Sequence, residues 1–304
     1  MAISRHQLVK ELEPGLNALF GLEYNRYDNQ HAEIYTSESS DRAFEEEVML
    51  SGFGNASVKS EGSGVAFDNA QESYSARYTH ETVALAFAIT EEAIEDNLYD
   101  KISSRYTKAL ARSMSNAKQV KAAAPLNNGL PSVDGFDSGD GVSLFNTAHT
   151  TVSGTNVKNT LTTQADLNET SLEQAMIDIS GMTDERGLRI AAKAVKMIVP
   201  SANQFQAERL MKSQGRTGTA DNDINALGSM GMIPQGYRVN NFLTDTDSFY
   251  IITDVPNGMK MFTRAPLTTA MEGDFDTGNV RYKARERYSF GVSDFRGIFG
   301  VEGA

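Results

Sequence analysis

Residues 90–124 decide the fold, and they read TEEAIEDNLYDKISSRYTKALARSMSNAKQVKAAA. Apolar or aromatic side chains recur here at every fourth position, the spacing of one face of an α-helix. They are Ile94, Leu98, Ile102, Tyr106, Leu110 and Met114. Thr90 can cap the first turn, and no glycine or proline follows before Pro125. The sequence predicts one helix over 90–124, about 50 Å long, in a chain whose compact radius of gyration would be only about 19 Å. This favours an elongated molecule.

Residues 44–88, just before this helix, are predicted to form a long extended loop of two strands. Apolar and polar side chains alternate on both sides of a tip rich in glycine and serine, which is strand periodicity. The tip contains Gly52, Gly54, Lys59, Gly62 and Gly64. An isolated hairpin is marginally stable in water, so we expect this loop to contact a partner.

The first 43 residues are predicted to form an arm. A short helix over 7–20 is expected to be interrupted at Pro14-Gly15, and residues 24–41 are polar without a sustained period. Such a segment buries too little apolar area to offset its ordering entropy, so we expect it to lie along another surface.

Beyond the long helix, the pattern alternates between helices and strands. Residues 126–160 look irregular. A capping box at Thr170 starts a second helix, an apolar strand spans 194–199, and Ser201 can cap a third helix.

Two hairpins are predicted in the last third of the chain. The first joins strands 249–253 and 259–264 around Asn257-Gly258. The second pairs the segment after Pro266 with residues 280–288. The fold class is therefore α+β.

Composition excludes several classes of protein. The 304 residues include 40 acidic and 28 basic side chains, for a formal charge of -12, and no cysteine. The lack of cysteine excludes disulfides, zinc ribbons, iron–sulfur clusters and thiol catalysis. No stretch approaches the roughly 18 apolar residues of a membrane helix, and no signal-peptide apolar region is present. The acidic balance argues against a protein that wraps nucleic acid, because phosphate binding depends on Lys and Arg.

A search for catalytic chemistry yields no convincing site. The glycines near residue 52 lack the third glycine of a dinucleotide fingerprint, and the acidic run from Asp221 lacks the glycine and glutamate of a calcium loop. His149 could be a base or ligand, but a lone loop histidine is more often a hydrogen-bonded structural residue. No catalytic, cofactor-binding or metal-binding residues are predicted, so the chain is not expected to be an enzyme.

One charged pattern remains open between two interpretations. Four basic residues share one face of the predicted strand 280–288, namely Arg281, Lys283, Arg285 and Arg287. They are either a solvated strand face or a basic edge that pairs with an acidic neighbour.

The order of these features resembles the major capsid protein of tailed bacteriophages with the HK97 fold. The arm, the glycine-rich loop and the helix starting Ile89-Thr90-Glu91-Glu92 come first. Further motifs resemble the Mu-type major head subunits, namely Ser143-Leu144-Phe145-Asn146-Thr147-Ala148-His149, Asn159-Thr160-Leu161, Leu172-Glu173-Gln174-Ala175-Met176 and Lys196-Met197-Ile198-Val199-Pro200. The chain then ends on long strands that include Arg285-Glu286-Arg287-Tyr288.

The resemblance implies an HK97-like division of the chain. Residues 1–43 would be the N-terminal arm and 44–88 the extended loop. A peripheral domain would comprise 89–155 and 260–304, including a spine helix over 90–124, and an axial domain would comprise 156–259. The glycines and Lys59 of the loop, with the four basic residues, are the expected intersubunit contacts.

The resemblance also implies a function. The chain would assemble into pentamers and hexamers of an icosahedral shell in the host cytoplasm and enclose double-stranded DNA without reading its sequence. Its other expected partners are a separate scaffolding protein, a portal and a decoration protein, with no cofactor and no membrane. Lys59 is not expected to crosslink, and the -12 charge predicts a lining that repels DNA mildly. An encapsulin-like nanocompartment and, more remotely, a soluble hydrolase using His149 are the alternatives.

Overall fold

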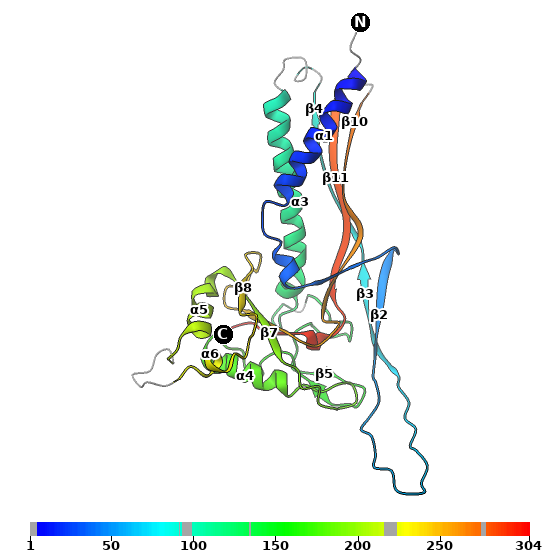
Figure 1. Ribbon diagram of the computed structural model, residues 1–304, viewed down its shortest axis with the longest axis vertical. Helices are drawn as coiled ribbons and strands as arrows, with labels where there is room; N and C mark the ends of the chain where they lie inside the picture. Colours follow the sequence, from blue (N-terminus) through cyan, green and yellow to red (C-terminus); the bar gives the residue numbers. More distant parts are fainter. Residues whose placement is uncertain (1–4, 91, 93–98, 134, 216–223, 275–277) are drawn as a thin grey trace.

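The computed structural model describes residues 5–90, 92, 99–133, 135–215, 224–274 and 278–304. It has three visible parts: a long stalk of helices and strands, a smaller lobe at one end of it, and a thin loop that projects from the same end (Figure 1). The elongated shape follows from the long helix, as the sequence predicted.

The stalk is a four-stranded sheet with two helices against it. The strand order is β1 (Thr36–Ser39), β10 (Met259–Gly273), β11 (Val280–Val292) and β4 (Glu81–Ile89). β1 is parallel to β10, and the other neighbours are antiparallel. The helices α1 (Arg5–Tyr24) and α3 (Tyr99–Asn128) pack on each other and on this sheet. Their shared core contains Leu16, Phe20, Leu110, Ala111, Met114, Tyr282 and Ala284.

The predicted long helix is present, with a different end. Residues 91 and 93–98 lie outside the described residues, and α3 continues past Pro125 to Asn128 instead of stopping at residue 124. Proline removes one helical hydrogen bond, but Leu126 is buried in a core cluster and its carbonyl accepts a hydrogen bond from the Tyr250 hydroxyl. Packing on both sides of the proline therefore keeps the helix intact.

The N-terminal helix is also longer than predicted. α1 runs continuously through Pro14, so the expected interruption at Pro14-Gly15 was wrong. Leu16 and Phe20 are buried against α3 and β11, which stabilises the helix beyond the proline. The segment then continues through the short 3-10 helix η1 (Gln30–Glu33) into β1.

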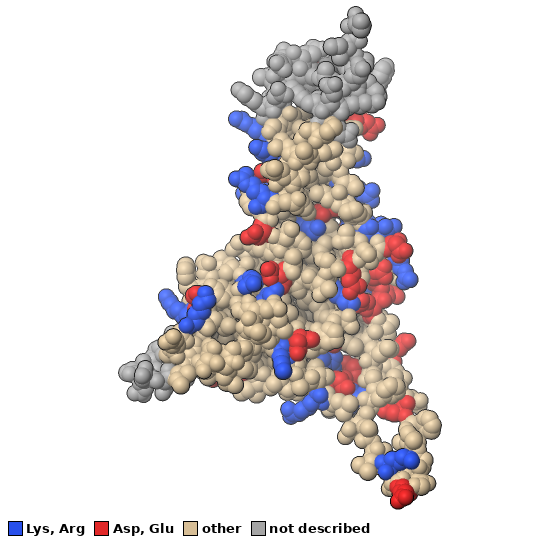
Figure 2. Space-filling model, in the orientation of Figure 1, with Lys and Arg blue, Asp and Glu red and all other residues tan. Residues whose placement is uncertain are grey.

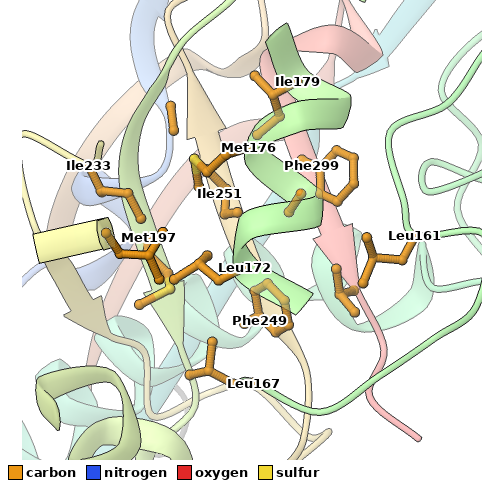
Figure 3. Close-up of a cluster of buried hydrophobic side chains, with 14 of the residues drawn as sticks. Leu161, Leu167, Leu172, Met176, Ile179, Met197, Ile233, Phe249, Ile251 and Phe299 are labelled. Atoms are coloured by element: carbon orange, nitrogen blue, oxygen red, sulfur yellow. The ribbon is translucent and has the colours of Figure 1, made fainter. Parts of the chain in front are cut away.

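The lobe is built on a second sheet. Its order is β12 (Ile298–Val301), β9 (Phe249–Thr253), β7 (Ala194–Val199) and β8 (Tyr237–Val239). The helices of the lobe are α4 (Glu169–Ser180), α5 (Gln204–Lys212) and α6 (Ala226–Met230). α4 covers the sheet and buries Leu172, Met176 and Ile179 against Ile251 and Phe299 (Figure 3). This core is why the lobe is compact.

The ends of two lobe helices differ slightly from the prediction. Asn168, two residues before Thr170, caps α4, because its side chain accepts a hydrogen bond from Ser171 N. Ser201 opens the short helix η2 (Ser201–Asn203), and α5 follows it. Among the described residues between α3 and α4, the strands are two residues long, namely β5 (His149–Thr150) and β6 (Asn156–Val157).

The first predicted hairpin, around Asn257-Gly258, was wrong. β9 lies in the lobe sheet and β10 in the stalk sheet, so the turn between them connects two sheets. Asn257 does adopt a left-handed conformation, with φ of 60°. The glycine is needed for another reason: a Cβ on Gly258 would meet the backbone of Gly297 at 2.8 Å. The second hairpin is confirmed as β10 paired with β11.

The extended loop has the two predicted strands, but its second strand is shorter than predicted. β2 (Phe44–Leu50) pairs only with β3 (Glu72–Thr79), and the next strand, β4, belongs to the stalk sheet. The end of the chain differs from the sequence-based division too. β12 and Phe295 pack in the lobe, whereas residues 260–304 were all expected in the peripheral part. Both differences arise from long-range strand pairing.

Candidate assembly surfaces

The loop between β2 and β3, residues 51–71, projects away from both the stalk and the lobe (Figure 1). It contains no helix or strand. Its large apolar side chains face solvent: Val58 is 97% exposed and Phe67 98%, with Phe53 and Val65 also exposed. Exposed apolar groups of this size gathered in one projection are typical of an interaction site.

A few polar contacts hold the two sides of the loop together. Ser51 N donates to Gln71 O at 2.9 Å, and the Ser51 hydroxyl accepts from Gln71 N. Further out, the Asp68 carboxylate accepts a hydrogen bond from Gly54 N at 2.7 Å and pairs with Arg186 at 2.8 Å. The hydrogen bond from Gly54, followed by that from Arg186, lowers the pKa of Asp68 below its usual value. Arg186 belongs to the lobe, so this pair links the outer part of the loop to the lobe.

At the base of the loop lies a buried group of charged side chains that the sequence did not reveal. Arg296 pairs with Glu185 at 2.7 Å and with Asp294 at 3.2 Å, and it also donates to Thr183 O. The second oxygen of Glu185 accepts from the Ser73 hydroxyl of β3. Burial raises the pKa of Asp294, although Arg296 opposes that effect. The group joins the lobe, the C-terminal segment and the loop.

The four basic residues of β11 share one face of the stalk sheet, as predicted. Arg281, Lys283 and Arg285 are exposed and Arg287 is half-buried, while Tyr282, Ala284 and Tyr288 face the helices. Small residues lie opposite them on β4, for example Ala84 and Ala86. Arg281 pairs with Asp274, and no ion pair joins Lys283, Arg285 or Arg287 to another described residue. The row is thus open and flanked by short side chains.

The opposite face of β11 contains a buried acidic residue, Glu286, that the alternating pattern did not predict. Glu286 is buried between Lys118 of α3, at 3.3 Å, and the Tyr24 hydroxyl of α1. Burial raises the pKa of Glu286, and Lys118 opposes this. The three side chains join both helices to the sheet.

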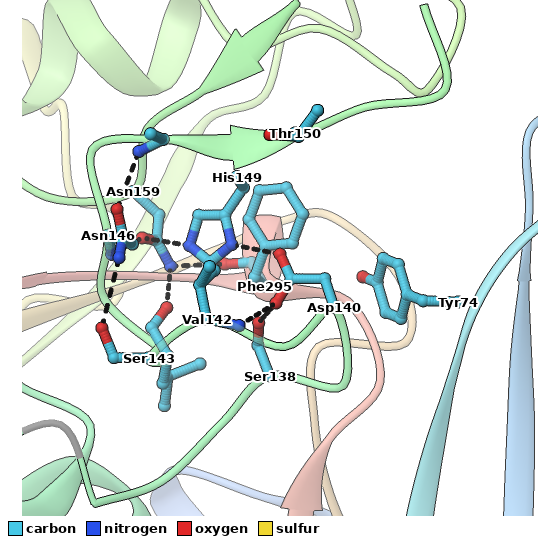
Figure 4. Close-up of polar contacts among 12 residues, drawn as sticks. Tyr74, Ser138, Asp140, Val142, Ser143, Asn146, His149, Thr150, Asn159 and Phe295 are labelled. Carbon is cyan, nitrogen blue, oxygen red and sulfur yellow. Dashed lines mark hydrogen bonds and ion pairs between the residues drawn. The ribbon is translucent and has the colours of Figure 1, made fainter. Parts of the chain in front are cut away.

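His149 lies in a buried polar network (Figure 4). Its Nδ1 lies 2.6 Å from Asp140 and its Nε2 lies 3.1 Å from the side-chain oxygen of Asn159. The His149 ring is fully buried and stacks on the Phe295 ring, with 3.9 Å between the two ring centroids. Burial alone would raise the pKa of Asp140, but hydrogen bonds from His149 and Ser138 outweigh it and lower the pKa. Both ring nitrogens are occupied, so this histidine has a structural role.

Among the described residues, no group of three or more His, Asp or Glu side chains is placed to hold a metal ion. None of the helices in the described part of the chain has the length and apolar character needed to cross a membrane. Residues 221–223, which begin the acidic run rejected above as a calcium loop, lie outside the described residues.

A family model described as a phage capsid protein matches residues 73–301, well over half of the chain. The chain belongs to the phage capsid protein family. The match covers three of the four strands of the stalk sheet (β4, β10 and β11), α3 and the whole lobe. The chain functions as a major capsid shell subunit. This function accords with a molecule whose distinctive features are contact surfaces.

Solved structures show that this capsid protein has an HK97-like fold. It matches the capsid of Myoviridae phage XM1 with a TM-score of 0.54 and 13% identity, over 89% of each chain. Mycobacterium phage Adephagia matches with a TM-score of 0.54 and 12% identity, over 91% of each. A virus-like particle from Pyrococcus furiosus matches with a TM-score of 0.51 and 11% identity, over 94% of this chain and 98% of that one. A comparison with curated proteins gives no match.

Sequence reasoning located the surface features of this capsid protein and missed the internal ones. The loop glycines and Lys59 lie in the projecting loop, and the basic row lies along the stalk. The structure does not bring these two sets together within one chain. The Arg296 group was missed because Arg296 and Glu185 are far apart in sequence. The Asp140–His149–Asn159 network was missed because it forms within an irregular segment that has no periodic pattern.

Proposed function

We propose that this chain assembles into the pentamers and hexamers of an icosahedral shell that encloses double-stranded DNA. The observation that carries the proposal is the projecting loop, in which Val58 and Phe67 are almost completely exposed. Burying each such side chain contributes about 1.5–3 kcal/mol. A subunit that leaves them in water is completed by a neighbouring copy.

In this proposal the loop lies over a neighbouring subunit. Gly52 and Gly62 have positive φ values of 66° and 79°, so the backbone there makes bends that other residues rarely adopt. Gly54, Gly64 and Lys59 complete the contact set along the tip. The loop is polar between its apolar side chains, as the rim of an interface is.

The basic row of β11 is the second proposed contact. Lys283, Arg285 and Arg287 are free of ion pairs with other described residues, and the chain has a surplus of acidic groups. An acidic surface of a neighbouring copy would be attracted to the row and oriented by it. Charge pairs of this kind govern association rate and orientation more than affinity.

The division into domains is also a proposal. The stalk, with residues 89–155 and 260–292, would be peripheral. The lobe, with residues 156–259 and the strand β12 that pairs in its sheet, would be axial and surround the capsomer centre, and residues 1–43 would tie capsomers together. A separate scaffolding protein, a portal and a decoration protein would complete the virion, which would be assembled in the host cytoplasm. Membership of the Mu-type branch stays a prediction.

Removing part of the loop tests the proposal. We expect a chain lacking residues 51–64 to keep its cooperative unfolding and to lose the ability to form particles. Electron microscopy and light scattering would detect the particles, and urea unfolding would measure the stability of the subunit. Equal particle yield from the shortened chain would contradict the proposal. The encapsulin-like alternative predicts particles that contain protein cargo instead of DNA, which nuclease treatment and staining distinguish.

A further inference from the structure

The charges of α3 are segregated along its length. From residue 103 to its end at Asn128 the helix has five basic residues and no acidic one. Two of the five are used inside the molecule, since Lys118 pairs with Glu286 and Lys121 pairs with Glu81. The other three, Arg105, Lys108 and Arg112, are exposed, and no ion pair joins them to another described residue. In a chain of charge -12, this is a local positive surface.

The three cations lie on one face of the helix. Their spacing of three and four residues places them on neighbouring turns, about 10 Å apart from first to last along the axis. The opposite face of α3 buries Leu110, Ala111 and Met114. Figure 2 shows Lys and Arg side chains gathered along the α3 side of the stalk.

A cleft of about 840 Å³ adjoins this face, between α3 and the end of α1. Lys108 and Arg112 line it together with Arg26. The acidic residues in its lining are Glu23, which pairs with Arg26 at 3.3 Å, and Asp28. The cleft therefore has a positive balance, and its remaining lining includes the polar side chains of Ser113 and Asn116.

We propose that this surface of α3 contacts the phosphate backbone of the enclosed duplex DNA through Arg105, Lys108 and Arg112. Each strand presents a phosphate about every 3.4 Å of duplex axis, so a length of about 10 Å offers about three phosphates. Serine and asparagine side chains add hydrogen bonds to phosphate oxygens. The inference rests on the proposed function, and it makes the α3 side of the stalk the inner side of the shell.

The composition of the surface favours a nucleic acid over an acidic protein segment. Protein interfaces need apolar or aromatic anchors at their centre. Between the three cations the helix exposes Ala109, and the large exposed side chains, Tyr106 and Val120, lie to the side of the row. Cations with small polar neighbours suffice for a phosphate backbone. The net charge of -12 predicted a lining that repels DNA mildly. In this proposal the α3 surface is an exception, because it attracts the DNA phosphates.

The test compares two variants that remove the same charge. The first is Arg105→Gln, Lys108→Gln and Arg112→Gln in the full-length unassembled chain. The matched control is Arg189→Gln, Lys193→Gln and Arg209→Gln, three exposed lobe cations without ion pairs to other described residues. Fluorescence anisotropy would measure binding of a 30-base-pair duplex between 50 and 200 mM salt, with two duplexes of different base composition. Particle formation with scaffold would be measured separately.

The logarithm of the affinity falls linearly with the logarithm of the salt concentration, and three phosphate contacts make this slope steeper by about 2.7. We expect the wild type and the control to lose about 40-fold more affinity than the α3 variant between 50 and 200 mM salt. Affinity should be equal for the two duplexes. Equal salt slopes for both variants, or displacement of DNA by polyglutamate at matched charge concentration, would overturn the inference. Failure to form particles would instead count against the proposed function, because DNA binding is measured without assembly.

Discussion

Two irregular segments of similar composition have opposite structures. Residues 51–71 and 129–161 are both rich in glycine, serine and asparagine. In the first, Val58 and Phe67 are almost completely exposed. In the second, Leu144, Phe145 and His149 are fully buried. The second segment is held by a hydrogen-bond network around Asn159, and the first by few contacts of its own (Figures 1 and 4).

The difference shows which parts of the subunit are complete by themselves. The segment 129–161 packs between the stalk and the lobe. Its buried polar side chains, such as Asn159 and His149, find hydrogen-bond partners within the chain. The loop 51–71 leaves apolar groups in water, which is unfavourable until another surface covers them. Substitutions in 129–161 should therefore change folding, and substitutions in 51–71 should change assembly.

The largest effect on folding is expected for Asn159→Ala. The Asn159 side chain donates to Leu144 O and Phe295 O and accepts from Asn146 N, and its oxygen lies 3.1 Å from His149 Nε2. Its removal leaves several buried polar groups without partners, so we expect a loss of about 3–4 kcal/mol in the free energy of unfolding. Urea unfolding would measure this. Asn156→Ala, at an exposed position of the same segment, is the control and should cost less than about 0.5 kcal/mol. Equal losses for the two variants would mean that the network around Asn159 does not stabilise the segment 129–161.

A smaller effect on the free energy of unfolding is expected when acid protonates His31. This residue lies in η1 and is buried within the chain. The ring is 7% exposed. Burial, together with the nearby charge of Lys118, lowers its pKa from 6.5 to about 4. The unfolded chain therefore binds the proton more readily, and this contribution to stability is lost as the pH falls from about 6.5 towards 4.

We expect a loss of about 2 kcal/mol from this group over that range, somewhat below the full linkage value. The measurement is the difference between wild type and His31→Gln in urea unfolding at several pH values. The variant should lack this part of the pH dependence. Parallel curves for the two proteins would show that His31 does not remain neutral in the folded state.

Sequence patterns predicted the local structure well where one element decides it. β7 has the predicted bounds, and the four-residue apolar spacing predicted α3. The alternation in β11 predicted which face bears the basic residues. Each of these depends on neighbouring residues of the chain, so the pattern contains the necessary information.

The patterns failed where distant segments decide the structure. Asn257-Gly258 has the composition of a hairpin turn, but the strands on either side find different partners. Pro125 would end a helix in isolation, but Leu126 is held in a core formed by several segments. The network of His149 needs Asp140, Asn159 and Phe295 together, and no local pattern predicts their meeting. The same limit applies to the loop, whose covering surface belongs to another copy in the proposed shell.

A local effect is expected at the outer part of the loop. Asp68→Asn weakens the hydrogen bond from Gly54 N and removes the ion pair with Arg186. We expect amide hydrogen exchange at Gly54 to become faster while global unfolding is unchanged, because these contacts lie on the surface. The control is Glu61→Gln, at the tip, for which we expect unchanged exchange at Gly54. Unchanged exchange in Asp68→Asn would mean that contacts other than those of Asp68 protect the Gly54 amide.

The smallest effect on folding, and the clearest separation of the two segments, is expected for Phe67→Ser. This side chain is 98% exposed, so its loss should change the free energy of unfolding by less than about 0.5 kcal/mol. If a neighbouring copy buries it, the shell loses about 2 kcal/mol per subunit, or about 30-fold in the association constant at each contact. Light scattering at increasing protein concentration would measure the rise in the concentration needed for particles. Phe67→Leu keeps an apolar side chain and should assemble much as the wild type does. Normal assembly by Phe67→Ser would mean that this exposed ring stays in water in the shell, and that the apolar contacts of the loop lie at Val58, Val65 or Phe53.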